Sequence, residues 1–270
     1  MKWGLVSKPS EYSYSVGKDI YKLLGRGTTL EHKLASQIAT EGYSLSEMNS
    51  LVDAFITIGG DGTILMTLQH TAKPVFPINT GRFGFLTEVE APQAQQAIKQ
   101  LRAGHFTVEE RIKLTVRLGK KKLPNAANDI AIHVANLGKI LPIRMFVNKT
   151  LTQSIYGDGL IVATPMGSTS HALSVGGPIV DPALNAYVVA PIAPFRHAAS
   201  AMVIPSDKKL KIRIERPANL VIDGLYIHEF LPEESLEIYE ASERAQFITL
   251  QNNFYRKIYR KMNFHYSKRL

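Results

Sequence analysis

The chain has 270 residues, of which 45% are hydrophobic and 20% are charged, enough apolar material for one large or two small globular domains. It contains no cysteine, which excludes disulfides, thiolate metal sites and cysteine nucleophiles. Lys and Arg outnumber Asp and Glu by 32 to 23, and this net charge of +9 favours anionic ligands such as nucleotides.

The start of the sequence, residues 1–9, lacks the apolar segment of a signal peptide and predicts a first strand over residues 3–7. No apolar run approaches the roughly 18 residues that a membrane span needs. We therefore expect a cytoplasmic protein with no membrane partner.

Strand and helix patterns alternate along the first hundred residues. The expected strands are 3–7, 55–58 and 75–78, and the expected helices are 14–24, 31–39, 63–70 and 92–102. Such alternation is typical of a parallel sheet covered by helices.

Beyond about residue 104 the pattern changes to short strands, in which apolar and polar residues alternate at 114–118, 130–132 and 210–214. Asn148-Lys149 and Asp223-Gly224 are typical of hairpin turns. These features predict an antiparallel β-sandwich. We expect an α/β lobe over residues 1–103, a β-sandwich lobe over 104–245, and a final segment, 246–270, that returns to the first lobe.

A glycine-rich turn, Gly59-Gly60-Asp61-Gly62-Thr63, directly follows the expected strand 55–58. Because glycine has no Cβ, a phosphate can approach the backbone N–H groups of such a turn. A carboxylate beside phosphates holds a metal ion or takes a proton from an attacking hydroxyl. The pairing of the turn with Asp61 indicates phosphoryl transfer to an alcohol. A purely structural strand-to-helix turn is the alternative, and neither a P-loop nor a dinucleotide fingerprint occurs.

A second block, residues 156–171, places hydroxyl side chains after an expected strand at 160–163. A helix starting there would offer N–H groups to an anion or to the polar edge of a ring. The alternative is an ordinary helix capped by Ser168 or Thr169. Asn128-Asp129 suits an adenine edge and ribose hydroxyls, or is simply turn chemistry.

Several other activities find little support in the sequence. No acid is spaced to complete a triad with Ser168 and His171, and the histidines show no metal-ligand spacing, so we predict no protein-built metal site. The basic segment 255–261 is either a nucleic-acid or membrane-surface contact or a solvated face. We favour the solvated face, and no nucleic-acid partner, because so short a segment supplies few phosphate contacts.

Taken in order, these blocks resemble the NAD kinase family. The matching stretches are Gly59–Thr63, Asn79–Leu86, Asn128-Asp129 and Gly157–Pro178. The resemblance implies two lobes with the active site between them. It also implies transfer of the γ-phosphate of ATP, or a phosphate of polyphosphate, to the adenosine ribose 2′-hydroxyl of NAD, giving NADP.

The resemblance also implies roles for individual residues. Asp61 would be the general base. The nucleotide-binding residues would be Gly59, Gly60, Gly62, Thr63, Asn128, Asp129, Lys139, Tyr156, Asp158, Thr169, Ser170, His171, Ser174, Ala193 and Asp223. Because the turn itself contains no Lys or Arg, we expect Mg²⁺ to supply the positive charge. A homodimer or homotetramer is expected on the resemblance alone.

The sequence departs from the family pattern at three places. Asn128-Asp129 stands for the usual Asn-Glu, Thr169-Ser170-His171 for Thr-Ala-Tyr, and Pro165-Met166-Gly167-Ser168 for Pro-Thr-Gly-Ser. These changes bear on substrate preference rather than on the reaction. A lipid kinase of the diacylglycerol type, a non-catalytic NAD(H)-binding regulator and a nucleic-acid-binding protein are the competing hypotheses.

Overall fold

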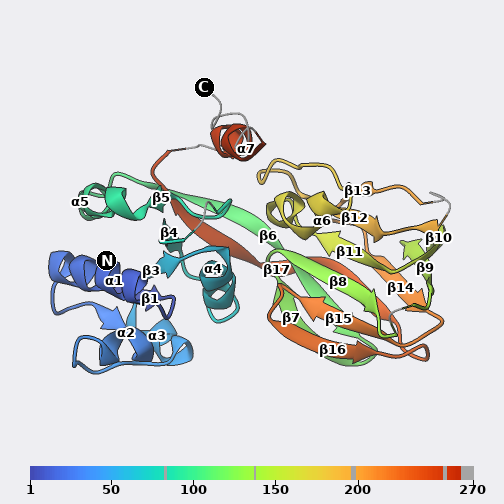
Figure 1. Cartoon of the computed structure of the whole chain (residues 1–270), viewed down its shortest axis with the longest axis horizontal. Helices are drawn as coiled ribbons and strands as arrows, with labels where there is room; N and C mark the ends of the chain where they lie inside the picture. Colours follow the sequence, from blue (N-terminus) through green and yellow to red (C-terminus); the bar gives the residue numbers. More distant parts are fainter. Residues whose placement is uncertain (82–83, 137, 196–198, 252–253, 263–270) are drawn as a thin grey trace. The chain divides into compact units, whose positions relative to one another are not determined.

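The computed structural model describes residues 1–81, 84–136, 138–195, 199–251 and 254–262 (Figure 1). The chain forms two compact units. Unit 1 comprises residues 1–110 and 245–270, and unit 2 comprises residues 111–244. Among the described helices, none is long and apolar enough to cross a membrane.

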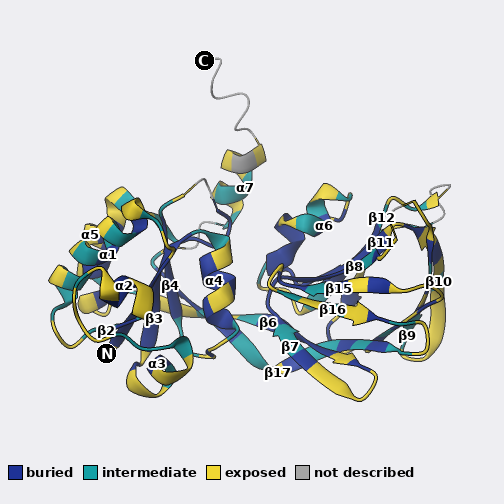
Figure 2. Cartoon of the chain, turned by 60° about the horizontal axis from the view of Figure 1, so that its bottom comes forward, coloured by how far each residue is buried: buried dark blue, intermediate teal, exposed yellow. Residues whose placement is uncertain are grey.

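Unit 1 is built on a parallel sheet with the strand order β2-β1-β3-β4, and β5 pairs with β4. Its first elements are β1 (Trp3–Ser7), α1 (Glu11–Leu24), β2 (Thr29–Leu30), α2 (His32–Ser36), α3 (Leu45–Leu51), β3 (Ala54–Gly59) and α4 (Asp61–Leu68). They are followed by β4 (Val75–Asn79), β5 (Val89–Glu90), the 3₁₀ turn η1 (Ala91–Gln93) and α5 (Ala94–Arg102). Figure 2 shows β3 and β4 buried throughout, as expected of strands covered on both faces.

Helices cover both faces of this sheet because successive strand residues point to opposite sides. Leu5 and Ile56 share a core with Ile20 of α1 and with residues of α2 and α5. On the other face, a Cβ placed on Gly4 would lie 2.8 Å from Cε of Met48 in α3. The predicted α/β lobe with a parallel sheet is therefore confirmed.

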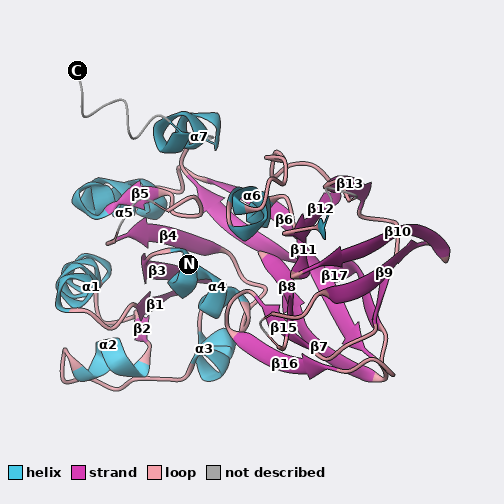
Figure 3. Cartoon of the chain, turned by 45° about the vertical axis from the view of Figure 1, so that its right-hand side comes forward, coloured by secondary structure: helices cyan, strands magenta, loops and turns pink. Residues whose placement is uncertain are grey.

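Unit 2 contains antiparallel strands, drawn as arrows in Figure 3, that enclose a core of aliphatic side chains. Its first elements are β6 (Thr107–Leu118), β7 (Lys121–Ala126), β8 (Asp129–Val134), β9 (Leu141–Val147), β10 (Thr150–Gly157), β11 (Gly159–Ala163), η2 (Met166–Thr169) and α6 (His171–Ser174). The remaining strands are β12 (Ala186–Ile192), β13 (Met202–Pro205), β14 (Leu210–Ile214), β15 (Ala218–Ile222), β16 (Tyr226–Phe230) and β17 (Leu236–Thr249).

One sheet of unit 2 has the order β13-β12-β11-β8-β15-β16, and its other layer includes β10-β9-β14-β17. Both predicted hairpin turns are present, with φ of 47° and 73° at Asn148 and Lys149, and 51° and 68° at Asp223 and Gly224. The predicted antiparallel β lobe is therefore confirmed. After β17 the chain continues as α7 (Phe254–Met262), which belongs to unit 1.

The expected helix over 31–39 is shorter in the structure, where α2 covers only His32–Ser36. Helix α3 was not predicted at all. Its start carries a recognisable signal, because the Ser44 side chain accepts from the Glu47 N–H while the Glu47 carboxylate accepts from the Ser44 N–H.

Candidate functional site

In unit 1 the glycine-rich turn lies where β3 ends and α4 begins. The carboxyl ends of parallel strands meet at one edge of a sheet, so the residues after β1 and β4 lie beside this turn. The Thr80 N–H donates to the Gly59 carbonyl at 3.0 Å, and the Lys8 N–H donates to the Ile58 carbonyl at 2.8 Å. Ligands of open α/β sheets bind at such an edge.

The glycines of the turn differ in what surrounds them. A Cβ on Gly59 would lie 2.3 Å from Thr63 Oγ1, so this glycine is required by packing. Among the described residues, a Cβ on Gly60 or on Gly62 would meet no atom within 4 Å. The backbone at these two positions is therefore open to a ligand, next to the unpaired N–H groups at the start of α4.

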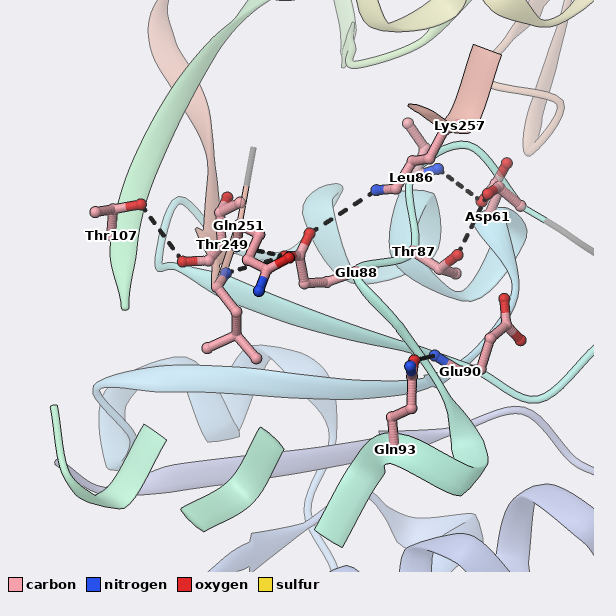
Figure 4. Close-up of polar contacts among 12 residues, drawn as sticks. Asp61, Leu86, Thr87, Glu88, Glu90, Gln93, Thr107, Thr249, Gln251 and Lys257 are labelled. Atoms are coloured by element: carbon pink, nitrogen blue, oxygen red, sulfur yellow. Dashed lines mark hydrogen bonds and ion pairs between the residues drawn. The ribbon is translucent and has the colours of Figure 1, made fainter. Parts of the chain in front are cut away.

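Asp61, the first residue of α4, is held by a second segment of the predicted motif (Figure 4). Its Oδ2 accepts from the Phe85 N–H at 3.1 Å and its Oδ1 accepts from the Leu86 N–H at 3.2 Å. A Cβ on Gly84 would lie 2.4 Å from Oδ1. Each carboxylate oxygen keeps a second lone-pair direction, so Asp61 still has capacity to accept a proton. Residues 82 and 83 of this motif lie outside the described residues.

Lys8 and Gly84 are candidate functional residues that were not predicted from the sequence. A Cβ on Gly59 would lie 3.2 Å from Lys8 Cβ, which places an exposed cationic side chain beside the turn. Lys8 could have been found from its place directly after β1, because the carboxyl ends of neighbouring parallel strands meet at one edge of the sheet.

In unit 2 the Asn128-Asp129 pair is held in place by Asp223. The Asp223 carboxylate accepts from the backbone N–H groups of Ala127, Asn128 and Asp129, at 2.9, 2.7 and 3.1 Å. The Asp223 N–H donates to the Asp129 carbonyl at 2.9 Å. Asp223 therefore fixes the loop that presents Asn128, and a direct contact of Asp223 with nucleotide stays a prediction.

Asp129 is a buried acid beside another buried acid, since it is 6% exposed and Asp223 is also 6% exposed. Burial, and next the negative charge of Asp223, raise the pKa of Asp129 to about 7. The Asn128 amide donates to Asp129 Oδ2 at 2.8 Å and opposes this rise. Asp129 thus changes charge near neutral pH.

The hydroxyl cluster after β11 is mostly occupied by the protein backbone. Thr164 Oγ1 donates to the Ala127 carbonyl at 2.7 Å and accepts from the Gly167 N–H at 3.1 Å. Ser168 Oγ donates to the Pro165 carbonyl at 2.6 Å and accepts from the Val180 N–H at 3.0 Å. The alternative that Ser168 or Thr169 caps a helix is wrong, because α6 begins after Ser170, which forms no side-chain cap.

His171 stacks on His133 of β8, with ring centroids 5.6 Å apart and planes at 19°. Burial and the nearby His171 lower the pKa of His133, which favours its neutral form. Ser170 and Ser174 are exposed, and Thr169 is buried. This group presents a stacked pair of imidazole rings and two exposed serines, of which Ser174 donates its hydroxyl to the His171 carbonyl at 2.7 Å.

Tyr156, Asp158 and Ala193 lie around Gly157. A Cβ on Gly157 would lie 2.7 Å from the Ile192 carbonyl oxygen and 3.1 Å from that of Ala193. Ala193 has a φ of 42°, a conformation that costs a non-glycine residue on the order of 1–3 kcal/mol. Tyr156 and Asp158 are exposed. Lys139 lies elsewhere in unit 2, in the loop after β8, where it lines a hollow with Arg216.

Within the described residues, no group of three or more His, Asp or Glu side chains could hold a metal ion. Mg²⁺ is commonly bound by one or two carboxylates together with substrate phosphates. Asp61, beside a glycine turn open to phosphates, fits that mode of binding.

The chain matches known protein families over most of its length. Residues 10–106 match the family model of the ATP-NAD kinase N-terminal domain, and residues 127–250 match that of the ATP-NAD kinase C-terminal domain. The chain is 37% identical over 242 residues to the NAD kinase of Methanoregula boonei, covering 88% of each chain.

Two solved structures share the fold. The NAD kinase of Archaeoglobus fulgidus, solved in complex with ATP, is 28% identical with a TM-score of 0.82, over 97% of this chain and 99% of that chain. Yeast NADH kinase, solved with NADH, is 21% identical with a TM-score of 0.91, over 98% of this chain and 88% of that chain. The latter likeness shows the fold alone.

Proposed function

Because this chain belongs to the NAD kinase family, and is thus a phosphotransferase with an alcohol acceptor, we propose that Asp61 is its general base. The acceptor is the 2′-hydroxyl of the adenosine ribose of NAD, and the product is NADP. The observation that carries the assignment is a carboxylate fixed by two backbone N–H groups at a turn in which Gly60 and Gly62 face open space.

The turn accounts for the binding of the phosphoryl donor. The open backbone at Gly60 and Gly62 admits a chain of phosphates, and the first N–H groups of α4 donate to them. Lys8 stands beside Gly59 and supplies a cation that the turn itself lacks. The structure of the Archaeoglobus fulgidus NAD kinase in complex with ATP supports ATP as the phosphoryl donor, with polyphosphate as the alternative.

The ribose hydroxyl is a weak nucleophile, so removal of its proton contributes to the rate. A positioned base such as Asp61 accelerates such a step by about 10²–10⁴-fold. The Phe85 and Leu86 N–H groups fix the orientation of the Asp61 carboxylate, and a free lone pair of this carboxylate takes the proton of the ribose hydroxyl. Mg²⁺, held by Asp61 and the donor phosphates, would neutralise charge on the transferred group.

We propose that unit 2 binds the adenosine part of NAD. Asn128, fixed through Asp223, presents its amide to the adenine or ribose, and the His133–His171 stack offers an aromatic face. Thr169, Ser170, Ser174, Asp158, Tyr156, Ala193 and Lys139 complete the proposed contacts. Assembly as a homodimer or homotetramer belongs to the same proposal, and analytical ultracentrifugation of the purified chain measures it.

One pair of assays tests the proposal. Purified protein with NAD, ATP and Mg²⁺ should form NADP, and Asp61→Asn should keep its fold and bind NAD while turnover falls at least about 100-fold. Near-full activity of Asp61→Asn would remove Asp61 from the chemistry. The comparisons support neither a lipid kinase nor a non-catalytic regulator, and phosphate incorporation into diacylglycerol instead of NAD would contradict the assignment.

A further inference from the structure

Unit 1 contains a hollow of about 300 Å³ whose lining includes no residue of the Gly59–Thr63 turn. Helix α7 forms one wall with three basic residues, Arg256, Lys257 and Arg260. Helix α5 contributes Gln96 and Gln100, which lie one turn apart. The hollow is thus lined by cations on one side and by neutral amides on another.

Both acids of this hollow accept hydrogen bonds, and Figure 4 shows those made to Glu88. Glu88 Oε1 accepts from the N–H groups of Leu250 and Gln251 at 2.9 and 3.2 Å. Glu88 Oε2 lies 3.8 Å from Lys257 Nζ, and the Glu88 side chain is only 7% exposed. The Glu90 carboxylate accepts from the Asn79 amide at 3.1 and 2.9 Å. Glu88 is balanced by Lys257, whereas Glu90 keeps its charge because the Asn79 amide is neutral, so the three cations of α7 exceed the two acids by one.

Arg256 and Arg260 have no such partner in the described part of the chain, since no hydrogen bond or ion pair engages either guanidinium there. They are four residues apart on α7, so they project from the same side of the helix. Like charges at this spacing repel each other and destabilise the helix. Paired guanidiniums bind phosphate groups through several parallel N–H donors.

We propose that this hollow is an effector site for a phosphorylated small molecule. The phosphate lies between Arg256 and Arg260, and the amides of Gln96 and Gln100 bind the polar remainder of the molecule. The hollow shares no residue with the proposed NAD and ATP contacts, although Gly84 in its lining lies beside Asp61, and only its effect on turnover rests on the proposed function.

A bound phosphate connects to Asp61 through the segment 84–88. Gly84 lines the hollow and lies against the Asp61 carboxylate, and Glu88 ties the same segment to Lys257 of α7. Neutralising the arginines stabilises the docked α7, and with it the segment that donates N–H groups to Asp61. The effector therefore raises turnover.

Isothermal titration of the full chain, saturated with NAD and a non-hydrolysable ATP analogue, tests the site with glycerol 3-phosphate and inorganic phosphate as probes. We expect Arg256→Gln/Arg260→Gln to bind the probes at least about tenfold more weakly than the wild type. Arg213→Gln, an exposed arginine on β14, is the matched control and should bind as the wild type does. Equal binding by the double variant, or no binding by the wild type, overturns the site.

A second variant covers the case in which the double variant loses α7. Gln96→Glu keeps a good helix former and places a carboxylate in the hollow, so it should also weaken the probes about tenfold. Turnover with saturating NAD and ATP should rise on adding glycerol 3-phosphate in the wild type and Arg213→Gln, but not in either hollow variant. Binding with no change of turnover overturns the effector role, and the titration is independent of whether the chain phosphorylates NAD.

Discussion

The glycines of the Gly59–Thr63 turn in unit 1 and those of the 157–167 block in unit 2 serve different purposes. The missing side chains of Gly60 and Gly62 leave open space. A Cβ on Gly159 would lie 1.9 Å from the Ile132 carbonyl oxygen, and one on Gly167 would lie 2.0 Å from that of Asn128. Unit 1 thus leaves backbone accessible to a ligand, whereas unit 2 uses glycine to pack backbone against backbone.

The acids of the two units differ in the same way. Asp61 is partly exposed and accepts from two N–H groups, which orient it. Asp129 is buried next to Asp223, and Asp223 accepts from three N–H groups that hold a loop. Similar residues thus present an oriented carboxylate at the turn in unit 1 and hold a loop in unit 2.

The largest expected effect comes from filling the space beside Asp61. Gly84→Ala places a Cβ 2.4 Å from Asp61 Oδ1, and the flexible carboxylate moves away rather than the backbone. A shift near 1 Å costs about 100-fold in rate, so turnover should fall by that factor while the melting temperature stays close to that of the wild type. Gly27→Ala, a glycine with open space around it, is the control. Full activity of Gly84→Ala would show that the position of Asp61 is not critical.

A matched pair of alanine variants tests the glycine comparison itself. Gly167→Ala forces the backbone near Asn128 to move, and we expect it to lose about 3 kcal/mol of unfolding free energy. Gly60→Ala has φ −119° and open space, so its stability should be unchanged or raised by about 0.4–1 kcal/mol, while its affinity for ATP falls. Urea denaturation measures the stability of the two variants, and titration with ATP measures their affinity for it. Equal losses of stability in the two variants would contradict the proposed difference between a packed Gly167 and an open Gly60.

Lys8→Met tests the charge beside the turn, because it keeps the length of the side chain and removes the ammonium. Loss of one charged contact of about 1.5 kcal/mol should raise the KM for ATP roughly tenfold, with the KM for NAD little changed. Lys33→Met, an exposed lysine on α2, should leave both constants as in the wild type. An unchanged KM for ATP would leave Mg²⁺ as the main source of positive charge.

The last expected effect concerns pH. The pKa of Asp129 is about 7 in the folded chain, above the usual 3.8, so the folded state binds more protons than the unfolded state between these values. This contribution to stability is present at low pH and is lost as pH rises towards about 7. Asp129→Asn removes it, so the free energy of unfolding of the variant relative to the wild type should increase from pH 5 to pH 7 and then level off. A pH-independent difference would contradict the raised pKa.

The sequence predicted the two kinds of lobe and both hairpins because their signals are local, namely residue periodicity and the turn residues Asn148-Lys149 and Asp223-Gly224. It could not predict contacts between distant segments. Lys8 reaches Gly59 only because β1 and β3 are parallel neighbours, and Asp223 meets Asn128 only because β15 pairs with β8. The alternative interpretation of Ser168 as a helix cap was wrong for the same reason, since its hydroxyl accepts from the Val180 N–H, twelve residues away.

The end of β17 has a consequence for synthesis of the chain. Phe247 pairs with Val75 of β4, and Glu88 accepts from the N–H groups of Leu250 and Gln251. Unit 1 therefore requires residues translated after all of unit 2. During translation, Val75 and Glu88 therefore lack their partners, Phe247, Leu250 and Gln251, until nearly the whole polypeptide has been synthesised. A chain truncated before residue 245 should thus leave the parallel sheet incomplete and sensitive to protease.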